Sequence, residues 1–195
     1  MKRFKELLLI AGLSTLSLSG AFALCRFPLE RVSAQSSEDQ VIYLNQGWSP
    51  EVREAYYHLS QGSTVMPYDV FLNLEAAGSQ DLFRSDANSE RYGLTPDPVN
   101  PRTNPDGLQI GLSKTATQEG PWKGDDVGLT CAACHNTELF YQGTRIRIDG
   151  GVGNHFDIEG YLSALDDAMQ ATLTDSAKFD RLAARQLGYP ACVQN

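Results

Sequence analysis

Two cysteines and a histidine in the stretch Cys131-Ala132-Ala133-Cys134-His135 constrain the fold more than any other part of the chain. The C-x-x-C-H spacing is typical of covalent haem c attachment. Across one helical turn the two sulfurs reach the two vinyl groups of one porphyrin, and the next residue offers its imidazole to the iron. The two alanines are small and leave room for the porphyrin face. The sequence therefore predicts one covalent haem c on Cys131 and Cys134, with His135 as proximal iron ligand.

Three other roles for these cysteines stay open. A structural zinc site would need two more ligands, and Cys192 and His155 would have to supply them at an unusual spacing. A thioredoxin-type redox pair needs its C-x-x-C at the end of a buried strand, whereas a stretch rich in proline and glycine precedes this one. A disulfide within the motif is the plain structural alternative. The adjacent histidine and the export signal described next favour haem.

The N-terminal segment has the pattern of an export signal. Three basic residues among the first five precede an apolar run over residues 7–24. Small residues allow cleavage after Ala23 or Ala34, and the polar QSSEDQ stretch that follows favours the second site. We therefore predict a signal peptide over residues 1–34 and a periplasmic or otherwise exported mature chain. A retained N-terminal anchor is the alternative, because the run nears the ~20 residues that a membrane helix needs.

The charge of the chain limits its partners. A formal net charge of −8 argues against binding to nucleic acid or to anionic membranes. Membrane contact is expected only if the N-terminal segment is retained. An exported protein with a haem would instead meet a redox partner protein or a small oxidant, in a compartment that is oxidising.

Helix start signals, apolar spacing and glycine or proline stops predict several helices. The expected ranges are 50–62, 67–78, 81–85, 157–173 and 175–187, the last burying Phe179, Leu182 and Leu187. Gly143 marks the turn of a small hairpin.

Residues 92–128 hold five prolines and many glycines without a sustained period. They predict a long loop wrapped over the bound group, with a solvated linker as the alternative. We therefore expect a mainly α fold over residues 35–195. This would be one cytochrome c-like helical domain with long Pro/Gly-rich loops and one small hairpin.

The sixth position of the iron decides between catalysis and electron transfer. His155 lies twenty positions after His135 and is the candidate sixth ligand, although it could equally cap the following helix. His58 in a helix, Met66 in a loop and Met169 in an apolar stripe are weaker candidates. An open sixth site, where oxygen or peroxide binds, is the other interpretation.

Charged side chains near the motif suggest supporting roles. Arg145 and Arg147 are candidates to pair with the haem propionates, although an exposed hairpin edge would carry the same charges. The nearest acidic residues in the sequence are Glu119, Asp125, Asp126 and Glu138. Cleavage of an O–O bond would need an acid–base group near the iron, but a solvated loop charge is the default role of each. No catalytic residue is therefore assigned.

Short stretches on both sides of the motif form a further pattern. They are Tyr57-His58, Gln61-Gly62-Ser63, Met66-Pro67-Tyr68, Tyr92-Gly93, Asn104-Pro105-Asp106-Gly107-Leu108, Gly128-Leu129-Thr130 and Ile148-Asp149-Gly150-Gly151. Together with the haem motif they resemble the N-terminal haem domain of the dihaem cytochrome c peroxidases and rubber-oxygenase-like cytochromes. The resemblance covers about residues 48–187.

The resemblance implies an exported, largely helical protein with two covalent haems. One haem would reduce peroxide or activate dioxygen, and the other would pass electrons. Cys131, Cys134 and His135 would hold the first haem. This chain departs from the pattern because it has one C-x-x-C-H motif and ends soon after residue 187.

Three functions follow as expectations. The first is an exported c-type cytochrome domain that transfers electrons, with peroxide or dioxygen chemistry if the iron has an open position. The second is a six-coordinate electron carrier without catalysis. The third is a truncated, non-catalytic fragment of a dihaem protein.

Overall fold

The computed structural model describes residues 41–118 and 123–188. The predicted signal peptide over residues 1–34, Glu119 and Cys192 lie outside the described residues. None of the helices in the described ranges has the length and apolar character needed to cross a membrane.

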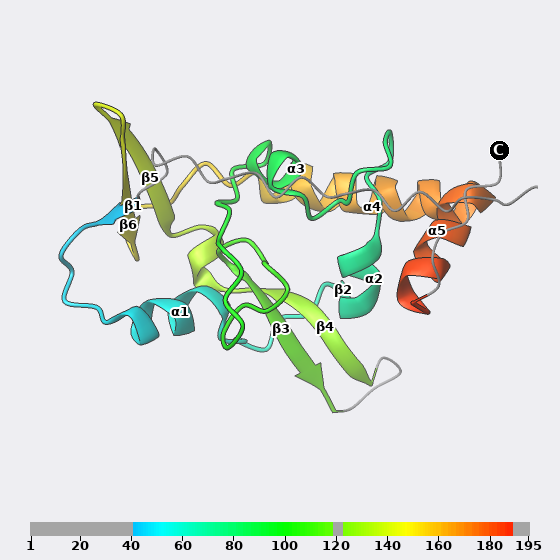
Figure 1. The fold of residues 1–195 in the computed structure, drawn as a ribbon, viewed down its shortest axis with the longest axis horizontal. Coiled ribbons are helices and arrows are strands. Elements are labelled where there is room, and N and C mark those ends of the chain that lie inside the picture. Colours follow the sequence, from blue (N-terminus) through cyan, green and yellow to red (C-terminus); the bar gives the residue numbers. More distant parts are fainter. Residues whose placement is uncertain (1–40, 119–122, 189–195) are drawn as a thin grey trace, which may run out of the picture. The chain divides into compact units, whose positions relative to one another are not determined.

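The first of two three-stranded sheets carries the strands that follow the haem motif (Figure 1). Its order is β1-β6-β5. Strand β1 (Val41–Tyr43) pairs in parallel with β6 (Thr144–Asp149), and β6 pairs antiparallel with β5 (Asn136–Tyr141). Gln142 and Gly143 connect β5 to β6 with positive φ angles of 49° and 78°, as in a type I′ turn. The predicted hairpin is confirmed.

The second sheet lies before the motif in the chain and has the order β2-β4-β3. Its strands β2 (Met66–Pro67), β4 (Gly124–Leu129) and β3 (Leu112–Thr117) pair antiparallel. The 3₁₀ turn η1 (Cys131–Ala133) follows β4 and leads into β5. The predicted haem motif therefore occupies the connection between the two sheets.

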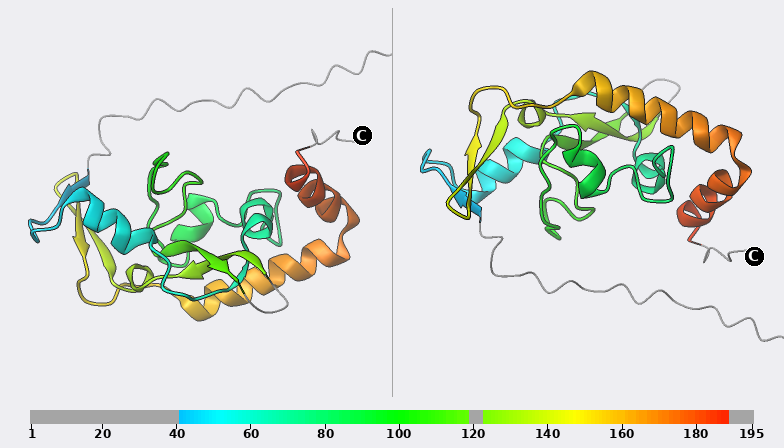
Figure 2. Two further views of the ribbon diagram at one scale, coloured as in Figure 1. Left: turned by 90° about the horizontal axis from the view of Figure 1, so that it is seen from below. Right: turned by 90° about the horizontal axis from the view of Figure 1, so that it is seen from above.

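Helix α1 (Pro50–His58) begins as predicted but ends before residue 62, and the predicted helices α4 (Ile158–Thr174) and α5 (Ser176–Gln186) are confirmed. Figure 2 shows the last two following one another, in orange and red, with a sharp turn between them. Their N-caps Ser49, Asp157 and Asp175 each accept a backbone N–H in the first turn.

Two further helices differ from the expected ranges. Helix α2 (Tyr68–Asn73) begins as predicted but ends before residue 78. Helix α3 (Asp86–Glu90) begins after the expected range 81–85, so that prediction is wrong. Residues 75 and 82 instead form an isolated antiparallel β-bridge, so the chain reverses direction between them before α3 begins.

The expected mainly α fold is wrong, because two sheets accompany the helices and the fold is mixed α/β. The segment 92–128, expected to be a loop, contains β3 and β4. These strands lack apolar alternation because several of their buried positions are polar. Ser113 is fully buried and Thr115 nearly so, and the Thr115 hydroxyl hydrogen-bonds to that of Ser60 at 2.7 Å. Buried polar residues thus interrupt the apolar alternation by which a half-buried strand is recognised in a sequence.

The main apolar core packs α2 and α4 around aromatic rings. The rings of Phe71 and Phe83 have centroids 6.5 Å apart, and those of Phe83 and Tyr161 are 5.2 Å apart. The buried members of this cluster are Tyr68, Phe71, Leu74, Phe83, Leu94, Leu108, Leu112, Val127, Ala133, Tyr161, Leu165 and Ala168. Ala133 of the motif belongs to it, so the core supports the motif directly.

Helix α5 docks through charges more than through the apolar face that was expected. Leu182 is buried, but Phe179 and Leu187 are exposed. The buried carboxylate of Glu75 pairs with three cations of α5. They are Lys178 at 3.4 Å, Arg181 at 2.7 Å and Arg185 at 2.9 Å.

Glu75 makes the stability of this contact depend on pH. Desolvation alone would raise its pKa, but hydrogen bonds from Arg181 and Arg185 outweigh burial and lower the pKa of Glu75 to about 2. A carboxyl group whose pKa falls on folding stabilises the native state above the unfolded-state pKa of 4.5. That contribution is lost as the pH falls from about 5 toward 2.

We predict that Glu75→Gln lowers the free energy of unfolding by about 2–3 kcal/mol at pH 7, because it leaves three cations without a charged partner. At pH 3 the difference in the free energy of unfolding between the variant and the unsubstituted chain should be smaller by about 2 kcal/mol than at pH 7. Urea unfolding at both pH values measures this. Asp166→Asn, at an exposed position of α4, serves as control and should change little at either pH. An equal loss at pH 7 and pH 3 would contradict the charge explanation.

Candidate functional site

The cysteines and histidine of the motif lie exposed, while the alanines between them are buried. Cys131 and Cys134 are free thiols, and His135 is exposed beside them. Ala132 and Ala133 have 0% and 2% exposed surface. The turn thus directs its chemically active side chains to one side and its methyl groups to the other.

The alanines are small for a different reason from the one expected. Gly111 has a φ of +95°, and a Cβ atom built on it would lie 2.2 Å from the Cα of Ala133. The backbone of the chain itself therefore occupies the inner side of the turn. The alanines make room for this backbone and not for the porphyrin face, since a haem on the two sulfurs would lie on the outer side.

Thr130 fixes the start of the turn. Its hydroxyl accepts a hydrogen bond from the backbone N–H of Ala132 at 3.2 Å and donates to the carbonyl of Tyr57 at 3.2 Å. Gln61 lies beside the first cysteine, where its side-chain oxygen accepts from the N–H of Cys131 at 3.3 Å and from its thiol at 3.2 Å. Helix α1 and the residues after it thus position the first cysteine.

The ring of His135 is oriented by a backbone carbonyl. Its Nδ1 lies 3.0 Å from the carbonyl oxygen of Gly151. A carbonyl can only accept, so Nδ1 carries the proton and donates, and in the neutral ring Nε2 keeps its lone pair. A metal-ligating histidine commonly donates its other N–H to a backbone carbonyl in this way. The tautomer required of a proximal haem ligand is therefore the one that the fold favours.

The loop 149–154 wraps the end of the motif. Gly150 has a φ of +64°, and a Cβ atom there would lie 3.2 Å from the ring of Trp48. The backbone N–H of Asn154 donates to the carbonyl of Cys134 at 2.7 Å, and its side-chain amide donates to that of Ala133 at 2.7 Å. Together with the bond from His135 to Gly151, these contacts tie the loop to three consecutive residues of the motif.

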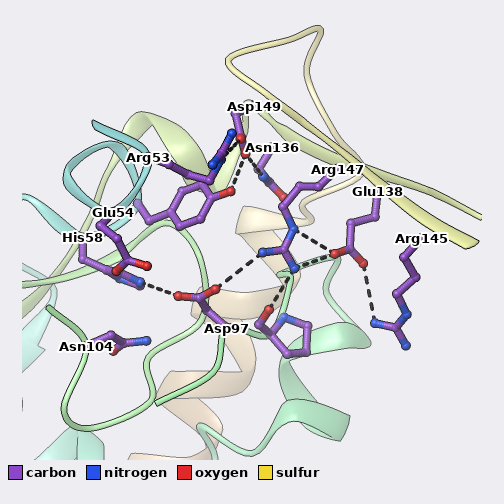
Figure 3. A network of polar contacts seen from close by, with 12 residues as sticks. Arg53, Glu54, His58, Asp97, Asn104, Asn136, Glu138, Arg145, Arg147 and Asp149 are labelled. Atoms are coloured by element: carbon purple, nitrogen blue, oxygen red, sulfur yellow. Dashed lines mark hydrogen bonds and ion pairs between the residues drawn. The ribbon is translucent and has the colours of Figure 1, made fainter. Parts of the chain in front are cut away.

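A buried carboxylate anchors this loop. Asp149 is fully buried and accepts hydrogen bonds from Arg53 at 2.7 Å, from Asn136 at 2.8 Å and from the hydroxyl of Tyr57 (Figure 3). Burial and the bond to Asp149 raise the pKa of Tyr57 well above its usual value, so its hydroxyl stays a donor. Asn136 follows His135 directly, which connects the anchor to the motif.

The structure places the four candidate sixth ligands differently. His155 is exposed and follows Asn154, so it lies on the loop that contacts the motif. Met66 in β2 and Met169 in α4 are half-buried and pack against the apolar core. His58 has a hydrogen-bond partner at each ring nitrogen. Of the four, His155 alone is exposed.

Most of the charged candidates have partners within the protein. Arg147 is buried and pairs with Glu138 and Asp97, an arrangement that does not suit it to bind a haem propionate. Arg145 lies 3.7 Å from the other oxygen of Glu138. Asp125 pairs with Lys114 at 2.9 Å, and the buried Asp126 accepts from Thr117.

Sequence reasoning missed Asn154, which contacts the motif through both its backbone and its side chain. The signal was present in the stretch from Asp149 to Asn154, where three glycines and one amide side chain separate a strand from a helix cap. An amide side chain among glycines is well suited to bond backbone carbonyls.

Comparison with known proteins gives little guidance on this site. The chain matches no protein-family model and no solved structure. It is similar to the uncharacterized protein y4iJ of Sinorhizobium fredii, with 30% identity over 209 residues. The match covers 95% of this chain and 33% of that protein, so the chain spans about a third of the length of this relative.

The anchoring role of Asp149 is testable. We predict that Asp149→Asn lowers the free energy of unfolding by about 3 kcal/mol, because Arg53 and Tyr57 then share a neutral buried partner. Asp125→Asn is the matched control, since its ion pair with Lys114 is half exposed and should contribute less than about 1 kcal/mol. Urea unfolding at pH 7 measures both. Equal effects of the two substitutions would contradict the role of Asp149.

Proposed function

We propose that this chain is an exported c-type cytochrome domain that binds one haem covalently and transfers electrons. The thioether positions are Cys131 and Cys134, and His135 is the proximal ligand. One observation carries the proposal: both thiols and the imidazole are exposed together, and the bond to Gly151 leaves Nε2 of His135 unprotonated. A buried motif, or one with the other tautomer, would not fit a haem.

The bound haem would supply a redox-active iron, and the chain's own residues would control its surroundings. Gly151 holds the imidazole in one orientation and, by accepting a hydrogen bond from its Nδ1, would increase the basicity of the ligating nitrogen. Asn154 and Thr130 hold the two ends of the turn. Two covalent bonds and a preset imidazole would limit the rearrangement that accompanies electron transfer.

A redox-active dithiol is the second candidate, because one observation favours it. A strand, β4, precedes the motif and ends two residues before Cys131, where a loop was expected. However, the turn η1 is three residues long and leads into β5, not into a long helix whose N-terminus would stabilise a thiolate. The dithiol also gives no role to the preset imidazole of His135, so haem attachment is the better proposal.

Catalysis remains tied to the sixth position of the iron. Peroxide or dioxygen chemistry, as in the dihaem peroxidases and oxygenases that the chain resembles, needs an open or weakly held site. A sixth bond from His155 would instead give a six-coordinate carrier. We propose electron transfer as the function common to both arrangements.

Haem attachment is tested by producing the full chain with its own N-terminal segment and a c-type maturation system. We expect haem that survives denaturing electrophoresis and a pyridine haemochrome spectrum of a two-thioether haem c. Cys131→Ala and Cys134→Ala should each lower the covalent haem content by about tenfold or change the spectrum to the one-thioether type. Cys192→Ala, outside the motif, should retain the haem. An exported, folded chain without covalent haem would refute the proposal.

The sixth position is tested by absorption spectra of His155→Ala with and without carbon monoxide. If His155 ligates the iron, we expect the variant to change from low spin to high spin and to bind carbon monoxide, as the unsubstituted chain does not. Met169→Leu is the control and should leave both spectra unchanged, because this side chain packs in the core. A high-spin spectrum in the unsubstituted chain would remove His155 as ligand and favour an open site.

A further inference from the structure

We propose a second metal site, formed by Glu54, His58 and Asp97, that binds a divalent transition-metal ion of the zinc class. It is separate from the haem motif and does not rest on the proposed haem function. One ligand atom from each of these residues lies within 4.8 Å of those from the other two. Figure 3 shows the carboxylate of Glu54 beside the ring of His58, with Asp97 facing the ring nitrogen.

The spacing fits a bound ion. Nε2 of His58 lies 3.1 Å from a carboxylate oxygen of Asp97. Nitrogen and oxygen ligands bind Zn²⁺ at about 2.0–2.2 Å, so two adjacent ligands of one ion lie roughly 3 Å apart. Only Glu54, an α1 residue near the surface, has to move closer for the three to share an ion.

The hydrogen bonds of His58 are compatible with a cation between its ring and Asp97. Its Nδ1 lies 2.9 Å from the carbonyl oxygen of Leu112, which can only accept, so Nδ1 is protonated. In a neutral ring Nε2 would then direct a lone pair at the Asp97 carboxylate. Both side chains are 6% exposed, so water hardly relieves this repulsion. Either a second proton or a metal ion must lie between the two atoms.

The outer contacts of the three residues suit metal ligands. Leu112 accepts from His58, Thr103 donates to Glu54 at 2.6 Å, and Arg147 lies 3.5 Å from the second oxygen of Asp97. Such partners orient ligands and are a regular feature of metal sites. Glu138 takes up part of the charge of Arg147, so Glu54 and Asp97 can both offer a carboxylate to the ion.

The site is open on one side. A cleft of about 500 Å³ lies between α1 and the loop 100–103, and Glu54 and His58 both line it. An ion held by three protein ligands would therefore have room for water or a small ligand in its remaining positions. A mixed nitrogen and oxygen set of this kind favours Zn²⁺, with Mn²⁺ as the weaker binder.

Calorimetric titration of the purified full chain with ZnCl₂ at pH 7.5, after chelator treatment, tests the proposal. The chain carries Cys131→Ala and Cys134→Ala, so that these thiols bind no zinc and the result is independent of haem attachment. We expect about one equivalent of Zn²⁺, and Glu54→Gln should weaken its binding by about tenfold or more. Glu54→Gln keeps the shape of the side chain and an acceptor for Thr103, so it should fold normally.

Two controls keep the outcome clear. Glu90→Gln, at an exposed position of α3, should leave zinc binding unchanged. Nitrogen NMR of the His58 ring should show one N–H in the zinc-bound chain, with Nε2 shifted on titration. Absence of zinc binding, binding that Glu54→Gln does not affect, or a ring with two N–H groups that zinc does not change would each overturn the proposal. The last result would identify a plain ion pair of His58 with Asp97.

Discussion

The buried carboxylate of Asp149 is the interaction on which the candidate haem site depends. It joins helix α1, through Arg53 and Tyr57, to strand β5, through Asn136, and it ends the strand from which the loop 149–154 departs. That loop in turn sets the tautomer of His135 through Gly151. Removal of a buried charged partner costs more than the pair itself contributes, so these elements are constrained to fold together.

Charge burial recurs across the described residues. Arg147 is enclosed by Glu138 and Asp97, and Glu75 holds three cations of α5. Buried ion pairs contribute little net stability compared with apolar packing, yet they have defined partners and geometry. We infer that they specify the arrangement of the elements while the aromatic cluster around Tyr161 supplies the stability. His58 and Asp97 are a further pair of buried titratable side chains, and they face one another beside the cleft.

Prediction from the sequence succeeded where the signal was local and failed where it was not. The caps at Ser49, Asp157 and Asp175 and the turn at Gly143 depend on neighbours within a few residues, and all four are confirmed. The strands β3 and β4 were missed because their buried positions include polar residues, Ser113 and Thr115 in β3 and Asp126 in β4. The reason for the small size of the alanines was missed, because Gly111 packs against Ala133 from 22 residues away.

The sequence by itself brings two thiols and an imidazole together in one turn. The C-x-x-C-H spacing thereby determines the chemistry that Cys131, Cys134 and His135 can perform. It also determined the N-caps of three helices and the hairpin turn, since these follow from backbone preferences of single residues. Only the tertiary structure decided which side of the turn is exposed, which nitrogen of His135 is available and where Asp149 is anchored. Arg53 and Tyr57 meet Asp149 across 96 and 92 residues, and no local preference encodes contacts at that separation.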